Sequence, residues 1–181
     1  MSVCAKIVRR RRQPLNSSVS PVSSVPQHPM EGKDPKLLEV WSQKSIPVVY
    51  RQEKGLPILL RLPYAATNRD WLRGEHRNKP NWNKRFKCWE APRAWFEDVV
   101  RRALAAYQRV YVIQPFQQHQ KCATSCWNAT GVECECSCMG AHHGSGNPAG
   151  KWHVVSDTFA IQWEQREYAC RLIERPAGSR G

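Results

Sequence analysis

The chain has 181 residues, of which 28 are Lys or Arg, 15 are Asp or Glu, and 41% are hydrophobic, a composition that fits one domain with a modest core. No apolar run reaches the roughly 18 residues of a membrane span, and none follows the basic N-terminus as in a signal peptide, so we expect a cytoplasmic, non-secreted protein. A formal net charge of +13 favours a polyanionic partner, most commonly nucleic acid. The charge does not distinguish DNA from RNA or from an acidic protein.

Residues 1–44 are predicted to form a disordered, basic, Ser/Pro-rich tail. Arg9 to Arg12 are consecutive, and residues 13–29 run through Ser, Pro and Val without periodicity, so this stretch has too little apolar surface to offset the entropy of ordering it. Near its end, Pro35 to Ser45 contains four large apolar residues and is predicted to form a short helix that docks on the core.

Residues 45–115 are predicted to form a basic α+β region that begins with a hairpin. The β-prone runs 48–50 and 58–62 flank a turn at Lys54-Gly55. Thr67, with an acid three residues later, predicts a capped short helix that stops at Gly74. Residues 80–89 are predicted to be a single extended segment.

The strongest periodic pattern predicts the main helix. Pro92 suits the first helical position, and apolar residues from Trp95 to Tyr107 recur at alternating spacings of three and four, which builds one apolar stripe. Residues 109–114 then predict a short buried strand that ends at Pro115.

Two more strands, at 159–163 and 168–173, are predicted within residues 151–176 and would complete the same domain. Strands and one strong helix without regular alternation indicate an α+β fold. We therefore expect a small mixed sheet packed on one main amphipathic helix, with an inserted Cys/His zinc-binding knuckle at residues 116–150.

The knuckle is predicted from a cluster of metal-binding side chains. Five thiols and two imidazoles fall between Cys122 and His143, and these are the ligands that tetrahedral zinc takes. Disulfides are disfavoured because the local cysteine count is odd and no signal peptide is visible. A structural, zinc finger-like ion would supply folding energy to a stretch with little core of its own. The predicted ligands are Cys122, Cys126, Cys134, Cys136, Cys138 and His143.

These donors exceed the four that one zinc ion needs, so either some are spectators or two ions share bridging sulfurs. The preferred single site uses Cys122, Cys126, Cys138 and His143, while the choice among the last three cysteines stays open. His119 and His153 are outside candidates, for which a surface or packed role is favoured.

Enzymatic alternatives have less support. The motifs of zinc deaminases and of His-Glu-x-x-His metalloproteases are absent from the sequence. Asp157, Glu164 and Arg166, with His142 or His153, could form a metal-dependent nuclease, although such spacing arises easily by chance. Whether the protein is an enzyme stays open, with a non-catalytic role favoured.

A basic and aromatic stretch is the candidate nucleic-acid contact. Cations hold phosphates while flat rings stack on unpaired bases, so the mixture suits single strands or duplex ends. Trp95 and Phe96 belong to the helix stripe and are assigned to the core. The predicted contacts are Arg69, Trp71, Arg73, Arg77, Lys79, Trp82, Lys84, Arg85 and Lys87.

Two resemblances accompany these motifs. The segments Arg61-Leu-Pro-Tyr64, Trp82 and Lys87-Cys-Trp-Glu-Ala-Pro92 resemble the HARP-type DNA-binding module of annealing helicases over about 50 residues. Residues 68–144, with Cys126-Trp-Asn128, Cys134-x-Cys-Ser-Cys-Met-Gly140 and His143-Gly144, resemble an uncharacterised family of prokaryotic and mobile-element proteins. That second resemblance implies the metal site and favours His143 over His142.

Together these features predict a zinc-stabilised nucleic-acid-binding accessory protein without its own catalysis. One alternative is a protein-interaction subunit or inhibitor acting on a nucleoprotein complex. The other is the metal-dependent nuclease. The sequence leaves the oligomeric state open.

Overall fold

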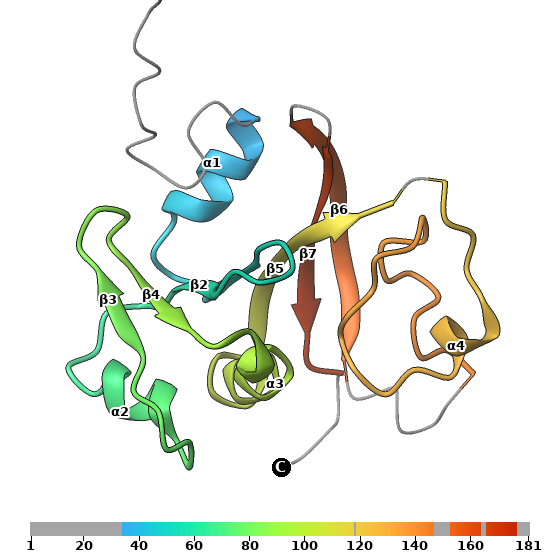
Figure 1. The fold of residues 1–181 in the computed structure, drawn as a ribbon. Coiled ribbons are helices and arrows are strands. Elements are labelled where there is room, and N and C mark those ends of the chain that lie inside the picture. Colours follow the sequence, from blue (N-terminus) through green and yellow to red (C-terminus); the bar gives the residue numbers. More distant parts are fainter. Residues whose placement is uncertain (1–33, 118, 147–152, 164–165, 177–181) are drawn as a thin grey trace, which may run out of the picture.

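The computed structural model describes residues 34–117, 119–146, 153–163 and 166–176, and a seven-stranded mixed sheet runs through them (Figure 1). Strands β1 and β5 are parallel, and the other neighbours are antiparallel. The α+β class is therefore confirmed, with a larger sheet than expected. In spatial order the strands are β3 (Asn81–Asn83), β4 (Cys88–Ala91), β2 (Ile58–Arg61), β1 (Val48–Arg51), β5 (Arg109–Phe116), β7 (Arg166–Glu174) and β6 (Val154–Trp163).

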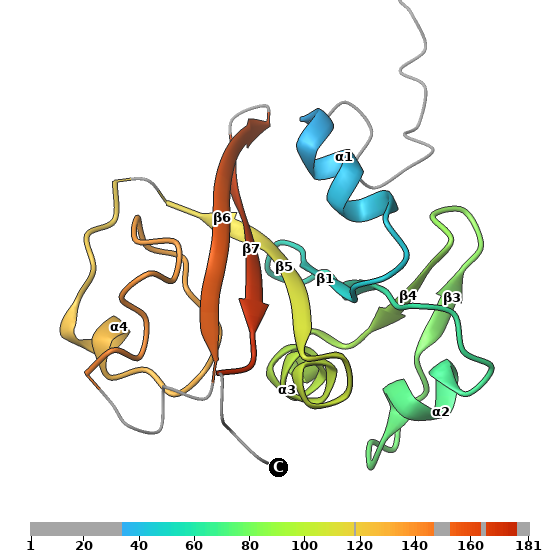
Figure 2. The ribbon, with the colours of Figure 1, turned by 180° about the vertical axis from the view of Figure 1, so that it is seen from behind.

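Helices lie on both sides of this sheet (Figures 1 and 2). Helix α1 (Pro35–Ser42) covers one face, and α3 (Phe96–Tyr107), entered through the 3₁₀ turn Arg93–Trp95, covers the other. Helix α2 (Asn68–Arg73) lies beside β3, and α4 (Thr124–Trp127) is a single turn in the cysteine-rich segment. No helix in the described ranges is both long and apolar enough to cross a membrane.

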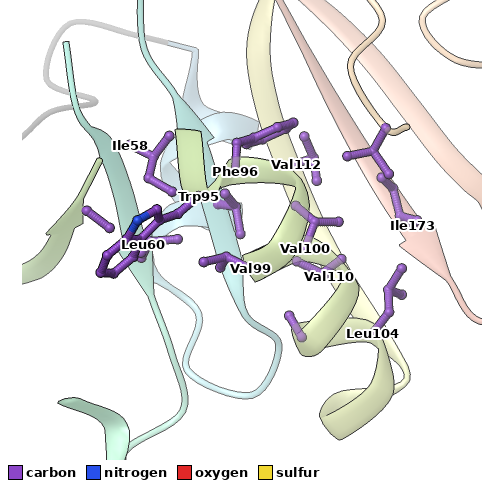
Figure 3. Packing of buried hydrophobic residues seen from close by; sticks show 14 of the residues in the cluster. Ile58, Leu60, Trp95, Phe96, Val99, Val100, Leu104, Val110, Val112 and Ile173 are labelled. Carbon is purple, nitrogen blue, oxygen red and sulfur yellow. The ribbon is translucent and has the colours of Figure 1, made fainter. Parts of the chain in front are cut away.

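Two apolar clusters explain why the strand sequences are nearly continuous runs of apolar residues. Alternate residues of a strand point to opposite faces, so a sheet covered on both faces needs apolar residues at successive positions. Val49, Ile58 and Val112 pack with the α3 stripe on one face (Figure 3). Their neighbours Val48 and Leu59 pack with α1 on the other face.

The folded region begins earlier than the predicted domain boundary at residue 44. The predicted docking helix forms as α1, and Leu37 and Trp41 are completely buried in its cluster. Asp34 caps this helix by accepting a 2.8 Å hydrogen bond from the backbone N–H of Lys36. Residues 1–33 of the predicted tail, including Arg9 to Arg12, lie outside the described residues.

Several local predictions are corrected by the structure. The predicted extended segment 80–89 is a hairpin, because Asn83 accepts a hydrogen bond from the N–H of Phe86 and turns the chain between β3 and β4. Strand β5 continues through Pro115, which is tolerated because the pairing of β1 with β5 stops at Ile113. Helix α2 forms as predicted, but its N-cap Thr67 makes no side-chain capping hydrogen bond within the described structure.

The cysteine-rich segment, residues 119–146, follows β5 in the chain and precedes β6. Figures 1 and 2 show it beyond β6 and β7, at the opposite end of the molecule from α2 and β3. The metal-ligand candidates and the predicted nucleic-acid contacts therefore occupy different ends of one sheet.

Candidate metal centre and basic surface

Five thiols from the cysteine-rich segment converge around Cys136. Its Sγ lies 3.3 Å from that of Cys138, 3.4 Å from that of Cys134, 3.5 Å from that of Cys122 and 3.6 Å from that of Cys126. Sulfurs bound to one zinc ion at about 2.3 Å stand about 3.8 Å apart, so this spacing is close to that of a thiolate-bound ion. The cluster can hold a metal ion.

The potential ligands form two groups that share Cys126. Cys122, Cys126, Cys136 and Cys138 place their sulfurs within 4.8 Å of one another. Cys126 also belongs to a second group with Cys134 and His143. His143 thus shares a group with Cys126, as in the preferred single site of Cys122, Cys126, Cys138 and His143, but its other partner in that group is Cys134.

Local backbone geometry brings these donors together. The turn of α4 presents Cys126, whose carbonyl accepts a 2.9 Å hydrogen bond from the N–H of Gly144 and so draws the histidine-bearing loop back over the cluster. Met139 and Gly140 have φ angles of 47° and 94°, which reverse the chain directly after Cys138.

Polar contacts fasten this segment to the sheet and to α3. Arg171 on β7 is completely buried and donates from Nη2 to the carbonyl of Val132 at 2.7 Å and to Oε1 of Gln114 at 2.8 Å. Gln114 on β5 in turn donates to the carbonyl of Cys134. The Glu97 carboxylate on α3 accepts a 2.8 Å hydrogen bond from the N–H of Val132.

A second anchor involves Arg51 on β1. Its guanidinium, almost fully buried, pairs with Glu133 at 2.6 Å and with Glu135. These acids flank Cys134, so the ion pairs hold the middle cysteines against the sheet.

The thiols cannot all ionise unaided, because they lie so close together. Burial and the neighbouring sulfurs raise the pKa of Cys122 to about 11 and that of Cys134 to about 12. Cys138 is the exception: burial raises its pKa, but backbone hydrogen bonds at His142 and Gly140 and nearby thiols outweigh this and lower it to about 6. A bound cation would be needed to favour several thiolates at once.

The histidines separate into ligand and non-ligand positions. Nδ1 of His143 lies 3.4 Å from the Cys126 sulfur, and burial together with Arg171 lowers the pKa of its ring, which keeps the neutral form that binds metal. His142 and His119 are exposed. His153 is buried, and its pKa is lowered to about 4 by burial, Arg171 and His143, but it belongs to neither ligand group among the described residues.

Of the carboxylates in the nuclease alternative, only Asp157 lies within the described residues, and it is not part of this cluster. Asp157 is an exposed residue of β6 that lies 4.0 Å from the Lys36 ammonium. Glu164 and the side chain of Arg166 lie outside the described part of the structure. The metal-ligand groups found among the described residues contain only cysteines and His143.

The predicted nucleic-acid contacts lie on α2, on the loop after it and on the β3–β4 hairpin. All seven of the predicted cations are exposed: Arg69, Arg73, Arg77, Lys79, Lys84, Arg85 and Lys87. The two tryptophans differ. Trp82 is 45% exposed, whereas Trp71 packs against the core, with its ring 6.0 Å from that of Tyr107 and Arg102 over its face.

A pocket of about 590 Å³ lies beside Trp82, between β2, the β2–α2 loop and the β3–β4 hairpin. Trp82 meets Trp89 edge to face on its wall, with ring centroids 5.1 Å apart. Tyr64, 95% exposed, lies at its margin. Its lining residues are Lys44, Leu60, Arg61, Leu62, Tyr64, Ala65, Asn68, Trp82, Lys87 and Trp89.

Sequence reasoning missed Arg171 and Gln114 as site residues, and it named Arg61 and Tyr64 only through the HARP-type resemblance, not among the predicted contacts. Arg171 carried one visible sign, since it is a charged residue inside the apolar run of β7. That resemblance named Tyr64 and Arg61 alongside Trp82, and the folding of the β3–β4 hairpin onto β2 places the three residues around one pocket.

No protein-family model, curated protein or solved structure matches the chain significantly. Function therefore has to be inferred from the residues of the metal centre and the basic surface.

Proposed function

We propose that this protein is a zinc-stabilised nucleic-acid-binding accessory protein without catalysis of its own, and that it engages unpaired bases at the pocket beside Trp82. The observation that carries this proposal is the pocket itself, where exposed aromatic rings and cations adjoin. The resemblance of residues 61–92 to HARP-type modules supports the same region as the contact surface.

Zinc is the proposed ion because of its ligands. Thiolates and an imidazole are soft and borderline donors that favour zinc over magnesium or calcium, which take oxygen ligands. The centre lies at the far end of the sheet from the pocket, so its role is to fold residues 119–146 onto β5 and β7. A structural ion of this kind contributes folding energy directly.

The pocket suits a nucleobase in both size and chemistry. Its volume lies within the range of about 300 to 1,000 Å³ that is usual for small-molecule sites. Rings such as those of Trp82 and Tyr64 offer flat faces to a base, and stacking is worth about 1 to 3 kcal/mol per base. Base faces are inaccessible inside a duplex, so we propose preference for single strands or duplex ends.

Cations surround this pocket and supply the phosphate contacts. Lys44, Arg61 and Lys87 line it, and its lining contains no carboxylate. The exposed cations of α2 and of the β3–β4 hairpin extend the positive surface outward. Each neutralised phosphate releases a counterion, so affinity should fall steeply as salt rises.

The test is fluorescence anisotropy with labelled single-stranded and duplex DNA and RNA across a salt series. We expect tighter binding of single strands, and a Trp82→Ala variant should weaken it by roughly 5- to 150-fold, the equivalent of one lost stacked base. Trp127→Ala is the matched control, because Trp127 is 50% exposed but lies in α4 at the other end of the molecule.

Lys84→Ala and Lys87→Ala should instead weaken all sequences alike and reduce the salt slope by roughly one unit each. Absence of binding at low salt would contradict the proposal. So would a Trp82→Ala variant that binds as well as the Trp127→Ala control.

A further inference from the structure

We propose that the cluster holds two zinc ions bridged by shared thiolates, rather than one ion with spectator ligands. This inference rests on the zinc assignment above and deepens it. Five sulfurs and one imidazole nitrogen converge here, whereas one tetrahedral ion uses four ligands.

The number of donors fits two ions. Two four-coordinate ions need eight bonds, and six donors supply eight when two of them bind both ions. Cys126 qualifies as one bridge because it belongs to both ligand groups. Cys136 qualifies as the other because its sulfur contacts the other four, including Cys122 of the first group and Cys134 of the second.

The remaining ligands then divide between the ions. Cys122 and Cys138 would complete the first ion, with which they share a ligand group. Cys134 and His143 would complete the second, on the side where Nδ1 of His143 faces Cys126 at 3.4 Å. A single ion in the first group would leave a buried thiol at Cys134 and an inward-facing imidazole at His143 without a metal.

The buried charge of Arg171 also favours two ions. Five thiolates carry five negative charges and two zinc ions carry four positive ones, so one negative charge remains. Arg171 supplies a single positive charge, is completely buried, and interacts electrostatically with Cys134, Cys136 and Cys138. Within the described structure its Nε and Nη1 are buried and make no hydrogen bond, so these two nitrogens have no acceptor that would offset their positive charge. An uncompensated buried charge of either sign would be costly.

The experiment is native mass spectrometry of the full chain, purified under reducing conditions from zinc-supplemented cells, combined with elemental analysis. We expect two zinc ions per chain. His143→Ala should lower the count to one, because it removes a terminal ligand of the second ion only. His142→Ala is the matched control, since His142 is the exposed neighbour, and it should retain two ions.

Replacement of zinc by ¹¹³Cd tests the bridges. Two cadmium resonances with through-bond coupling between them would establish shared sulfurs, and two uncoupled resonances would contradict them. One ion per chain, unaffected by His143→Ala, would overturn the two-ion centre and leave the zinc-stabilised nucleic-acid binder standing. A chain purified without any zinc whose residues 119–146 are nevertheless ordered would overturn both.

Discussion

Arg171 occupies the space where a side chain at Gly140 would begin. A Cβ added at Gly140 would lie 2.6 Å from Nη1 and 3.2 Å from Cδ of Arg171. The turn after Cys138 therefore closes tightly on the buried guanidinium, and the absence of a side chain at position 140 permits it. This contact joins the cysteine-rich segment to β7.

Gly140→Ala should consequently destabilise the protein more than strain in the backbone alone explains. Gly55 has a similar φ angle, 90° against 94°, but a Cβ added there would meet no atom within 4 Å. Gly55→Ala is therefore the matched control, with an expected loss of about 1 to 3 kcal/mol from the unfavourable φ. Urea unfolding should show a larger loss for Gly140→Ala, and equal losses would argue against a tight Gly140–Arg171 contact.

Removal of zinc should loosen one segment and spare the rest. Val132 is the residue of the described range 119–146 that joins an apolar cluster, so we expect this range to depend on the proposed ion, whereas α3, β1 and β5 share a core of their own. Hydrogen exchange measured after addition of a zinc chelator should show lost protection within 119–146 and retained protection in α3. The same chelator loaded with zinc beforehand is the control. Uniform loss of protection, or none, would contradict this division.

The seven thiols of the described residues should fall into two reactivity classes. Burial is the main cause that raises the pKa of Cys88 and of Cys170 to about 12, so hardly any of either thiol is ionised at pH 8. We expect iodoacetamide to leave both unmodified in the native protein, with or without chelator. The five cluster cysteines should be protected by zinc. They should become reactive once a chelator removes it, because the loosened residues 119–146 then expose their thiols to solvent. Mass spectrometry of digested protein reads out each site, and early modification of Cys88 or Cys170 would contradict their burial.

The ionisation of Asp98 should make part of the free energy of unfolding depend on pH. Burial raises the pKa of this carboxyl, but hydrogen bonds from Arg102 and His76 outweigh it and leave the pKa lowered. The ionised carboxylate therefore stabilises the fold above the unfolded-state pKa of about 4, and this contribution is lost as pH falls through the lower folded-state value.

Because the Asp98 side chain is 46% exposed, Asp98→Asn should cost at most about 1 kcal/mol at pH 7. The difference from the unsubstituted protein should vanish in acid. Thermal unfolding between pH 3 and pH 7 measures this, with Asp70→Asn on α2 as an exposed control. A difference that persisted unchanged at pH 3 would contradict the ionic role of Asp98.

Local pattern was sufficient for some elements of this fold. The alternating spacing from Trp95 to Tyr107 predicted a helix with one apolar stripe, and α3 buries that stripe. The β-prone runs around Val49 and Leu59 predicted a hairpin, and the antiparallel pairing of β1 with β2 confirms it. The cysteine cluster was predictable because thiols and imidazoles this close in sequence have few other uses.

Other features depend on contacts between distant residues, which local pattern does not encode. Trp71 looked available for stacking, yet α2 turns it toward Tyr107 and Arg102 on α3. Nothing near Arg171 in the sequence indicates that a loop from much earlier in the chain would pack on it. The ligand grouping likewise depends on how α4 and the turn at Gly140 fold, which spacing alone left open.

Zinc K-edge X-ray absorption of the purified, reduced chain tests the proposed metal centre most directly. We predict a first shell dominated by sulfur at about 2.3 Å, with a minor contribution from nitrogen at about 2.0 Å. A shell of nitrogen and oxygen without sulfur would contradict a centre built from Cys122, Cys126, Cys134, Cys136, Cys138 and His143.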